Sequence, residues 1–113
     1  MNYFNAIESL PGFGGPSDAF NGRFIHTGNL TVSYWEIKAG FVIPEHQHVH
    51  EGVATILEGE VEMTVNGETR VLTAGMTAFV PSNVLHSGKV ISDCKMMDIF
   101  YPEREDYKAL VAN

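Results

Sequence analysis

Apolar and polar residues alternate with a period of two along most of the chain, a pattern typical of half-buried β-strands. The segments that alternate most clearly are residues 30–37, 61–65, 69–72, 77–80 and 94–101. One of the breaks between them, Asn66-Gly67, is the pair favoured in a type I′ hairpin turn, because both central residues of that turn adopt positive φ. Strands this short and this closely spaced predict an all-β sandwich or barrel.

The two ends of the chain depart from this alternation. Residues 1–20 are rich in glycine and proline and predict an irregular N-terminal arm, whereas residues 21–113 predict a single domain. Residues 103–112 have helical character and follow Pro102, a residue suited to the first turn of a helix. We therefore expect a short C-terminal helix, with its acidic residues, including Glu103, facing water.

Composition narrows the possible partners. The 113 residues carry a net charge of −7, the wrong sign for the phosphate contacts that drive binding to nucleic acid. No apolar run is long enough to span a membrane, and the N-terminus lacks the pattern of a secretion signal, so we expect no membrane partner and a cytoplasmic location. A single cysteine, Cys94, excludes an internal disulfide and a thiolate metal cage.

The size of the domain also suggests self-association. A small domain with 11% aromatic residues has sheet edges and apolar outer faces to cover, and exchange of the N-terminal arm between two copies would cover them. We therefore expect a homodimer. Within the strand at residues 30–37, alternation predicts that only one of Tyr34 and Trp35 faces inward.

Three histidines are the strongest chemical signal. His46 and His48 are two residues apart, so on a strand their side chains point to the same side, and His86 lies near the start of another predicted strand. Imidazole is the commonest protein ligand for divalent transition metals, and three of them leave coordination positions open. The pattern predicts a site for nickel, zinc, manganese or iron, among which the residues do not discriminate.

The spacing of these residues resembles the two signature motifs of the cupin superfamily. The first motif matches at Gly40, His46, His48 and Gly59, and the second matches at Gly75, Pro81 and His86. The resemblance implies a conical β-barrel of the jelly-roll type, a double-stranded β-helix, with the metal inside. Where the first motif usually has glutamate or glutamine as a fourth ligand, this chain has Gly52. Water, His50 or Glu51 would complete the shell, and we favour water.

A finer resemblance covers residues 40–107 and is to the small cupins of pectin and uronate breakdown, which convert unsaturated uronates to linear keto acids. It implies catalytic or binding roles for Asp98, Phe100 and Arg104. Asp98 would transfer a proton if burial raised its pKa, Arg104 would bind the carboxylate of an anionic sugar acid, and Phe100 would form an apolar wall. The alternatives are that Asp98 pairs with Arg104 and that Phe100 only fills the core.

Three functions follow from this pattern. The first is metal-dependent ring opening and tautomerisation of an unsaturated uronate or a related keto sugar acid, with the metal as a Lewis acid. The second is a three-histidine iron dioxygenase, which the missing fourth ligand favours. The third is a non-catalytic cupin that binds a small molecule. We favour the isomerase-type enzyme.

Overall fold

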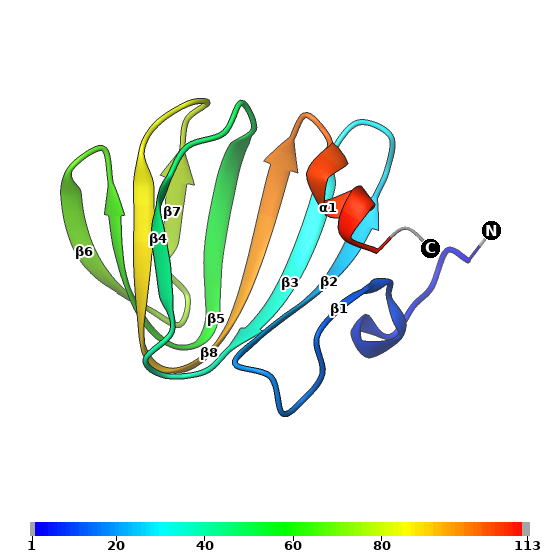
Figure 1. Cartoon of the computed structure of the whole chain (residues 1–113), viewed down its shortest axis with the longest axis horizontal. Coiled ribbons are helices and arrows are strands. Elements are labelled where there is room, and N and C mark those ends of the chain that lie inside the picture. Colours follow the sequence, from blue (N-terminus) through cyan, green and yellow to red (C-terminus); the bar gives the residue numbers. More distant parts are fainter. Residues whose placement is uncertain (1, 112–113) are drawn as a thin grey trace.

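Two long strands form the frame of the fold. The computed structural model describes residues 2–111, and in it β5 (Glu51–Val65) and β8 (His86–Tyr101) pair antiparallel from end to end. The other strands and the two short helices join this pair as follows (Figure 1): η1 (Ile7–Ser9), β1 (Gly12–Phe13), β2 (Phe20–His26), β3 (Thr31–Ile37), β4 (Val42–His46), β6 (Glu68–Thr73), β7 (Thr77–Val80) and α1 (Glu105–Leu110).

Both long strands bend near their middle, where the register between them shifts from Ile56 to Val61. Gly59 lies in this bend with φ +85°, and a Cβ atom there would overlap the backbone carbonyl of Asp93 on β8. Only glycine therefore allows the two backbones to approach this closely. The bend divides the pair into two halves, so that each long strand contributes to two sheets.

Hydrogen bonding joins all eight strands of residues 2–111, and the bend divides them into two sheets that give the expected jelly-roll barrel. One has the order β1-β2-β3-β8-β5-β7, and the other is made of β4, β6 and the remaining halves of β8 and β5. The inward side chains of both sheets form the core, which includes Phe24, Trp35, Ile56, Val61 and Met96. Figure 1 shows α1 beside one end of the barrel. None of the helices in residues 2–111 has the length and apolar character that crossing a membrane requires.

Several expectations from the pattern are confirmed. The strand at residues 30–37 is β3, and of its two large aromatic residues Trp35 is buried whereas Tyr34 lies on the opposite face, partly exposed. Asn66 and Gly67 have φ values of 50° and 79°, as a type I′ turn requires. The N-terminal arm, in contrast, is less irregular than expected, because Gly12 and Phe13 form β1 and pair with β2 of the same chain.

Other expectations are wrong in detail. The segment at residues 94–101 is the second half of a 16-residue strand that begins at His86. The helix begins at Glu105, so Pro102 lies before it and not in its first turn. Glu103 is buried, because its carboxylate accepts a hydrogen bond from the backbone N–H of Gly28 at 2.7 Å and pairs with Lys108 at 3.0 Å.

An apolar row crosses the outer face of the larger sheet. Its members are direct cross-strand partners on five neighbouring strands, in the order Ile25, Val32, Ile99, Val53 and Phe79. All but Val32 count among the exposed large apolar residues, and Phe79 keeps 60% of its surface accessible. We call these five residues the outer apolar row.

Candidate metal centre

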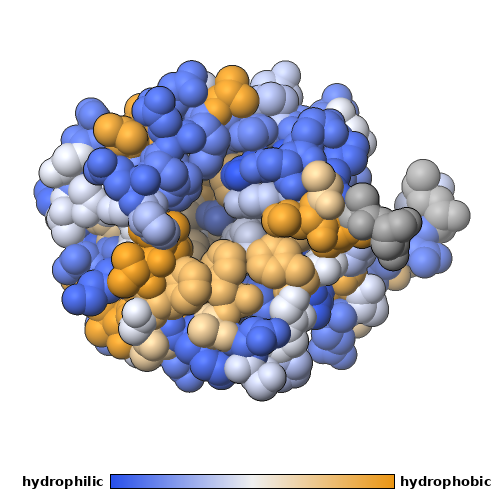
Figure 2. All heavy atoms as spheres, in the orientation of Figure 1, coloured by the Kyte–Doolittle hydropathy of each residue, from blue (hydrophilic) through white to orange (hydrophobic). Residues whose placement is uncertain are grey.

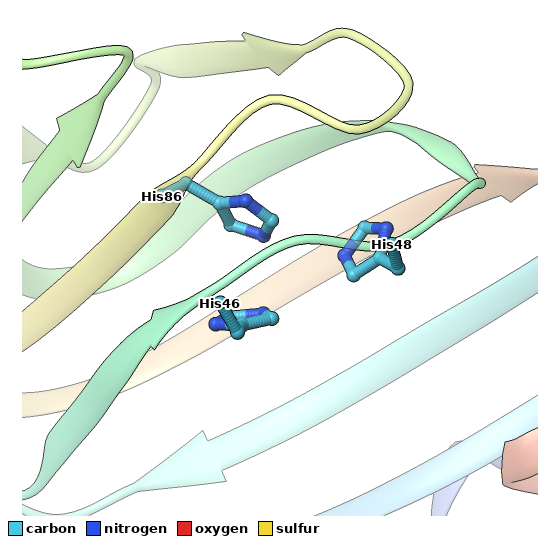
Figure 3. Close-up of side chains that lie close together, drawn as sticks. All are labelled: His46, His48 and His86. Carbon is cyan, nitrogen blue, oxygen red and sulfur yellow. The ribbon is translucent and has the colours of Figure 1, made fainter.

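The three predicted ligands come together at one side of the barrel. His46 ends β4, His48 follows in the loop to β5, and His86 begins β8 directly opposite His46 in the sheet. One nitrogen from each ring lies within 4.8 Å of the other two, and Figure 3 shows the three rings around a common space. The ring centroids of His46 and His86 are 4.1 Å apart, and those of His48 and His86 are 4.8 Å apart.

The backbone fixes the tautomer of each ring. The Nδ1 atoms of His46, His48 and His86 lie 2.8, 2.9 and 2.8 Å from the carbonyl oxygens of Pro44, His50 and Val84. A carbonyl oxygen only accepts hydrogen bonds, so each Nδ1 carries the hydrogen and each Nε2 keeps its lone pair. Because each acceptor is two residues away in sequence, the local chain path orients all three rings as a metal site requires.

Electrostatics favour the neutral form that binds a metal. Burial lowers the pKa of His48 to about 4, and the positive charge of Arg104 adds to this effect. Burial also lowers the pKa of His86. Both rings are therefore neutral at pH 7, and their Nε2 lone pairs are free to coordinate a cation.

Gly52 occupies the place of the usual fourth ligand, and Phe100 fills the space beside it. The two residues are cross-strand partners on β5 and β8. A Cβ atom on Gly52 would lie 3.1 Å from both Cδ1 and Cε1 of the Phe100 ring. The same ring packs edge-on against His48, with centroids 5.7 Å apart and planes at 84°.

Neither protein group considered as a replacement ligand joins the cluster. Among residues 2–111, the group at this site consists of the three histidines alone. Glu51 is exposed and precedes the inward Gly52, so strand alternation directs it away from the barrel. His50 acts instead through its carbonyl oxygen, which holds the His48 ring in place. Sequence patterns give no sign of this backbone contact.

The three histidines line a cavity of about 100 Å³. Besides the three rings, its lining includes Trp35, Gly52, Asp98, Phe100 and Tyr107, and most of its other residues are apolar. His46 is exposed at the edge of this space, whereas His86 is buried. Figure 2 shows a hollow near the middle of the face that it draws.

Asp98 faces the cavity from β8. Its Oδ2 atom accepts a hydrogen bond of 3.0 Å from the indole N–H of Trp35 on the neighbouring strand β3. Burial in the barrel raises the pKa of Asp98 to about 7, although the Trp35 hydrogen bond and the charge of Arg104 partly oppose the rise. Asp98 is therefore a carboxyl group that can give or take a proton near neutral pH.

Arg104 is 5% exposed and pairs with Asp106, to which Nε and Nη2 donate hydrogen bonds of 2.9 and 2.7 Å. Its guanidinium carbon lies 4.5 Å from the centroid of Phe100 and 3.8 Å from that of Tyr107. The alternative in which Arg104 pairs with Asp98 is wrong. Arg104 does not line the cavity, and its Nη1 atom is buried without a hydrogen-bond partner.

Tyr107 is a cavity residue for which the sequence predicted no role. It extends from α1, stacks on Phe24 with centroids 5.0 Å apart, and meets Trp35 and Phe100 edge-on. Burial raises its pKa above the ordinary value for tyrosine, so the hydroxyl stays neutral. The available signal was its place at the end of the segment that resembles the uronate cupins.

Comparisons with known proteins agree with this geometry. A sequence model described as cupin domain matches residues 33–100. An uncharacterized protein of Streptomyces coelicolor is 27% identical over 81 residues, which are 71% of this chain and 77% of that protein. The structure of an RmlC-like cupin from Shewanella frigidimarina aligns with a TM-score of 0.85 and 27% identity, over 95% of this chain and 96% of the other.

The structure of KdgF from a Halomonas species aligns with a TM-score of 0.83 and 23% identity, over 94% of this chain and 98% of that one. At this identity the likeness shows the fold. The barrel, the three-histidine cluster and the match over more than half of the chain lead to one conclusion: the protein belongs to the cupin family.

Proposed function

We propose that the protein is a metal-dependent isomerase that opens a small anionic sugar acid, such as an unsaturated uronate, and tautomerises it to a linear keto acid. The observation that carries this proposal is Asp98, a carboxyl group with a pKa of about 7 in the same cavity as the three histidines. The sequence resemblance over residues 40–107 supports the choice of substrate.

The donor set suits a divalent transition metal. His46, His48 and His86 would hold the ion through their Nε2 atoms, because their Nδ1 atoms are bonded to carbonyl oxygens. Nickel, zinc, manganese and iron all accept such ligands. When bound, the ion supplies a Lewis acid that lowers the proton affinity of a hydroxyl or carbonyl oxygen.

Asp98 would move the proton. In the isomerisation a hydroxyl proton leaves, the ring C–O bond breaks as carbonyl groups form, and the proton ends on a carbon of the former double bond, so no co-reactant is needed. Trp35 holds Oδ2 of Asp98, which leaves Oδ1 to take and return the proton. A pKa near the working pH suits both directions of transfer.

The walls of the cavity limit what enters. A cavity of about 100 Å³ is smaller than the roughly 150 Å³ that accommodates a benzene molecule. Only the reacting end of a sugar acid would fit between Phe100, Tyr107 and the histidines, with the rest at the mouth beside His46. Arg104 does not line this cavity, so the predicted contact between its guanidinium group and a substrate carboxylate is not part of the proposal.

The proposal is tested with metal-loaded protein and an unsaturated uronate, by following the ultraviolet absorbance of the conjugated double bond. The wild type is expected to remove this absorbance, and Asp98→Asn is expected to be slower by a factor of about 10² to 10⁴. Full turnover by Asp98→Asn would exclude its proton-transfer role. Tight binding of the acid without any turnover would favour the non-catalytic alternative.

A second candidate is a three-histidine iron dioxygenase. The observation that favours it is the presence of Gly52 where a carboxylate ligand is usual, since three imidazole ligands leave several coordination positions open. Oxygen consumption by the iron-loaded protein in the presence of small keto acids separates the two functions. No oxygen uptake together with uronate turnover would exclude the dioxygenase.

A further inference from the structure

We propose that Phe100 and Gly52 act as a pair that limits the metal centre to three protein ligands, so that two adjacent oxygen atoms of a substrate can bind the remaining positions. The inference rests on the metal-binding function proposed above and narrows the substrate to acids with an oxygen next to the carboxylate. It assigns Phe100 a second role besides that of an apolar wall.

A side chain at position 52 and the ring of Phe100 would compete for the same space. Gly52 is buried and faces Phe100 across the β5–β8 ladder, with backbone held on its other side by pairing with Val80 of β7. A β-carbon at position 52 would meet two ring atoms of Phe100 at 3.1 Å, so the ring would have to give by a few tenths of an ångström. The backbone at Gly52 has little freedom to yield, because β5 is paired with a strand on each side there.

The ring itself is also held in place. Phe100 is 6% exposed and contacts His48 on one side and Tyr107 on another, with centroid distances of 5.7 Å in both cases. The guanidinium group of Arg104 covers its face at 4.5 Å. Any side chain at position 52 would therefore crowd a ring that three neighbours support, and a longer side chain would need a larger shift of that ring.

The open positions favour a ligand with two oxygen atoms. Among residues 2–111, the lining of the cavity includes no lysine or arginine, and beyond the histidines Asp98 is the one lining group that ionises near neutral pH. An acid that enters therefore finds no side-chain cation in the lining to pair with its carboxylate. An α-hydroxy or α-keto acid would coordinate through the carboxylate and the adjacent oxygen together, which strengthens binding because the second contact is intramolecular.

The first experiment measures cobalt(II) affinity by competition with a coloured chelator, for the wild type, Gly52→Glu, Phe100→Ala and the double variant. Gly52→Glu alone should not tighten binding, because Phe100 blocks the new carboxylate. The double variant should bind cobalt at least about tenfold more tightly than Phe100→Ala. Gly52→Leu combined with Phe100→Ala is the matched control, which adds bulk without a ligand and should show no gain.

Tighter binding by Gly52→Glu with Phe100 in place would overturn the inference, and so would a double variant no tighter than Phe100→Ala. Circular dichroism and thermal melting establish that each variant is folded. Phe100→Val replaces Phe100→Ala throughout if the alanine variant does not fold, since valine also removes the ring edge beside Gly52.

The second experiment adds glycolate or acetate to the cobalt-loaded wild type and follows the visible cobalt bands. Glycolate, with a hydroxyl next to its carboxylate, should bind about tenfold or more tightly than acetate. The advantage should disappear in the folded double variant, where the new carboxylate takes an open position. Equal binding of the two acids would refute the two-oxygen site. A wild type that bound no cobalt would instead refute the metal centre itself, and this inference with it.

Discussion

Replacing Asp98 by asparagine should change how the stability of the metal-free protein depends on pH. The folded structure raises the pKa of Asp98 from 3.8 to about 7, with burial as the main cause. Each pKa unit corresponds to about 1.4 kcal/mol, so the ionised carboxylate costs the folded state about 4 kcal/mol. Asparagine keeps an oxygen that accepts the Trp35 hydrogen bond but carries no charge at any pH.

The direction follows from proton linkage. Below pH 3.8 Asp98 is protonated in both the folded and the unfolded chain and contributes nothing. Between pH 3.8 and about 7 the unfolded chain ionises while the folded one stays protonated, so the free energy of unfolding of the wild type falls. Above this range both are ionised and the loss is complete. The free energy of unfolding of Asp98→Asn does not fall in this way, because asparagine does not ionise.

The assay is urea denaturation in a chelating buffer between pH 4 and pH 8, followed by the fluorescence of Trp35, the single tryptophan. As the pH rises from 4 to 8, the difference in the free energy of unfolding between Asp98→Asn and the wild type should increase by about 4 kcal/mol. Glu62→Gln, at an exposed acid of β5, is the matched control and should track the wild type. Parallel curves for Asp98→Asn and wild type would refute a raised pKa for this carboxyl group.

Three further changes test other parts of the account. His48→Ala should weaken zinc binding by about 100-fold or more in a chelator competition, and an unchanged affinity would remove His48 from the ligand set. Trp35→Phe removes the N–H that stabilises ionised Asp98, so the pKa of Asp98 should rise. The rising limb of the activity–pH profile should then shift to higher pH, and an unshifted limb would contradict this coupling. We also propose that a second copy of the chain covers the outer apolar row. Ile99→Lys should then convert a dimer to a monomer, as measured by light scattering. A wild type that is already monomeric at micromolar concentration would refute this proposal.

Much of the fold and the three metal ligands could be predicted, because the sequence patterns that indicate them are local. Alternation along a strand predicts that one of Tyr34 and Trp35 faces inward, and the two cupin motifs single out His46, His48 and His86, which the structure brings together. The turn at Asn66-Gly67 follows from the conformational needs of two residues. Such features depend on neighbours in sequence, so a pattern of residues is enough to find them.

The missing parts depend on contacts between residues distant in sequence. The bend at Gly59 looks like the end of a strand in the sequence, whereas in the structure β5 continues through it because β8 passes close by. The contact of Phe100 with Gly52 joins positions 48 residues apart, and no local pattern reports it. The partner of Arg104 could not be chosen from sequence either, because Asp98 and Asp106 are both near it along the chain.

The central claim, that three imidazoles share one cation, is tested most directly by X-ray absorption spectroscopy on protein purified without a histidine tag and loaded with zinc. We predict one tightly bound ion per chain with three imidazole nitrogens in its coordination shell, and one imidazole fewer in His86→Ala. A wild type without a bound ion, or a spectrum that His86→Ala leaves unchanged, would contradict the claim.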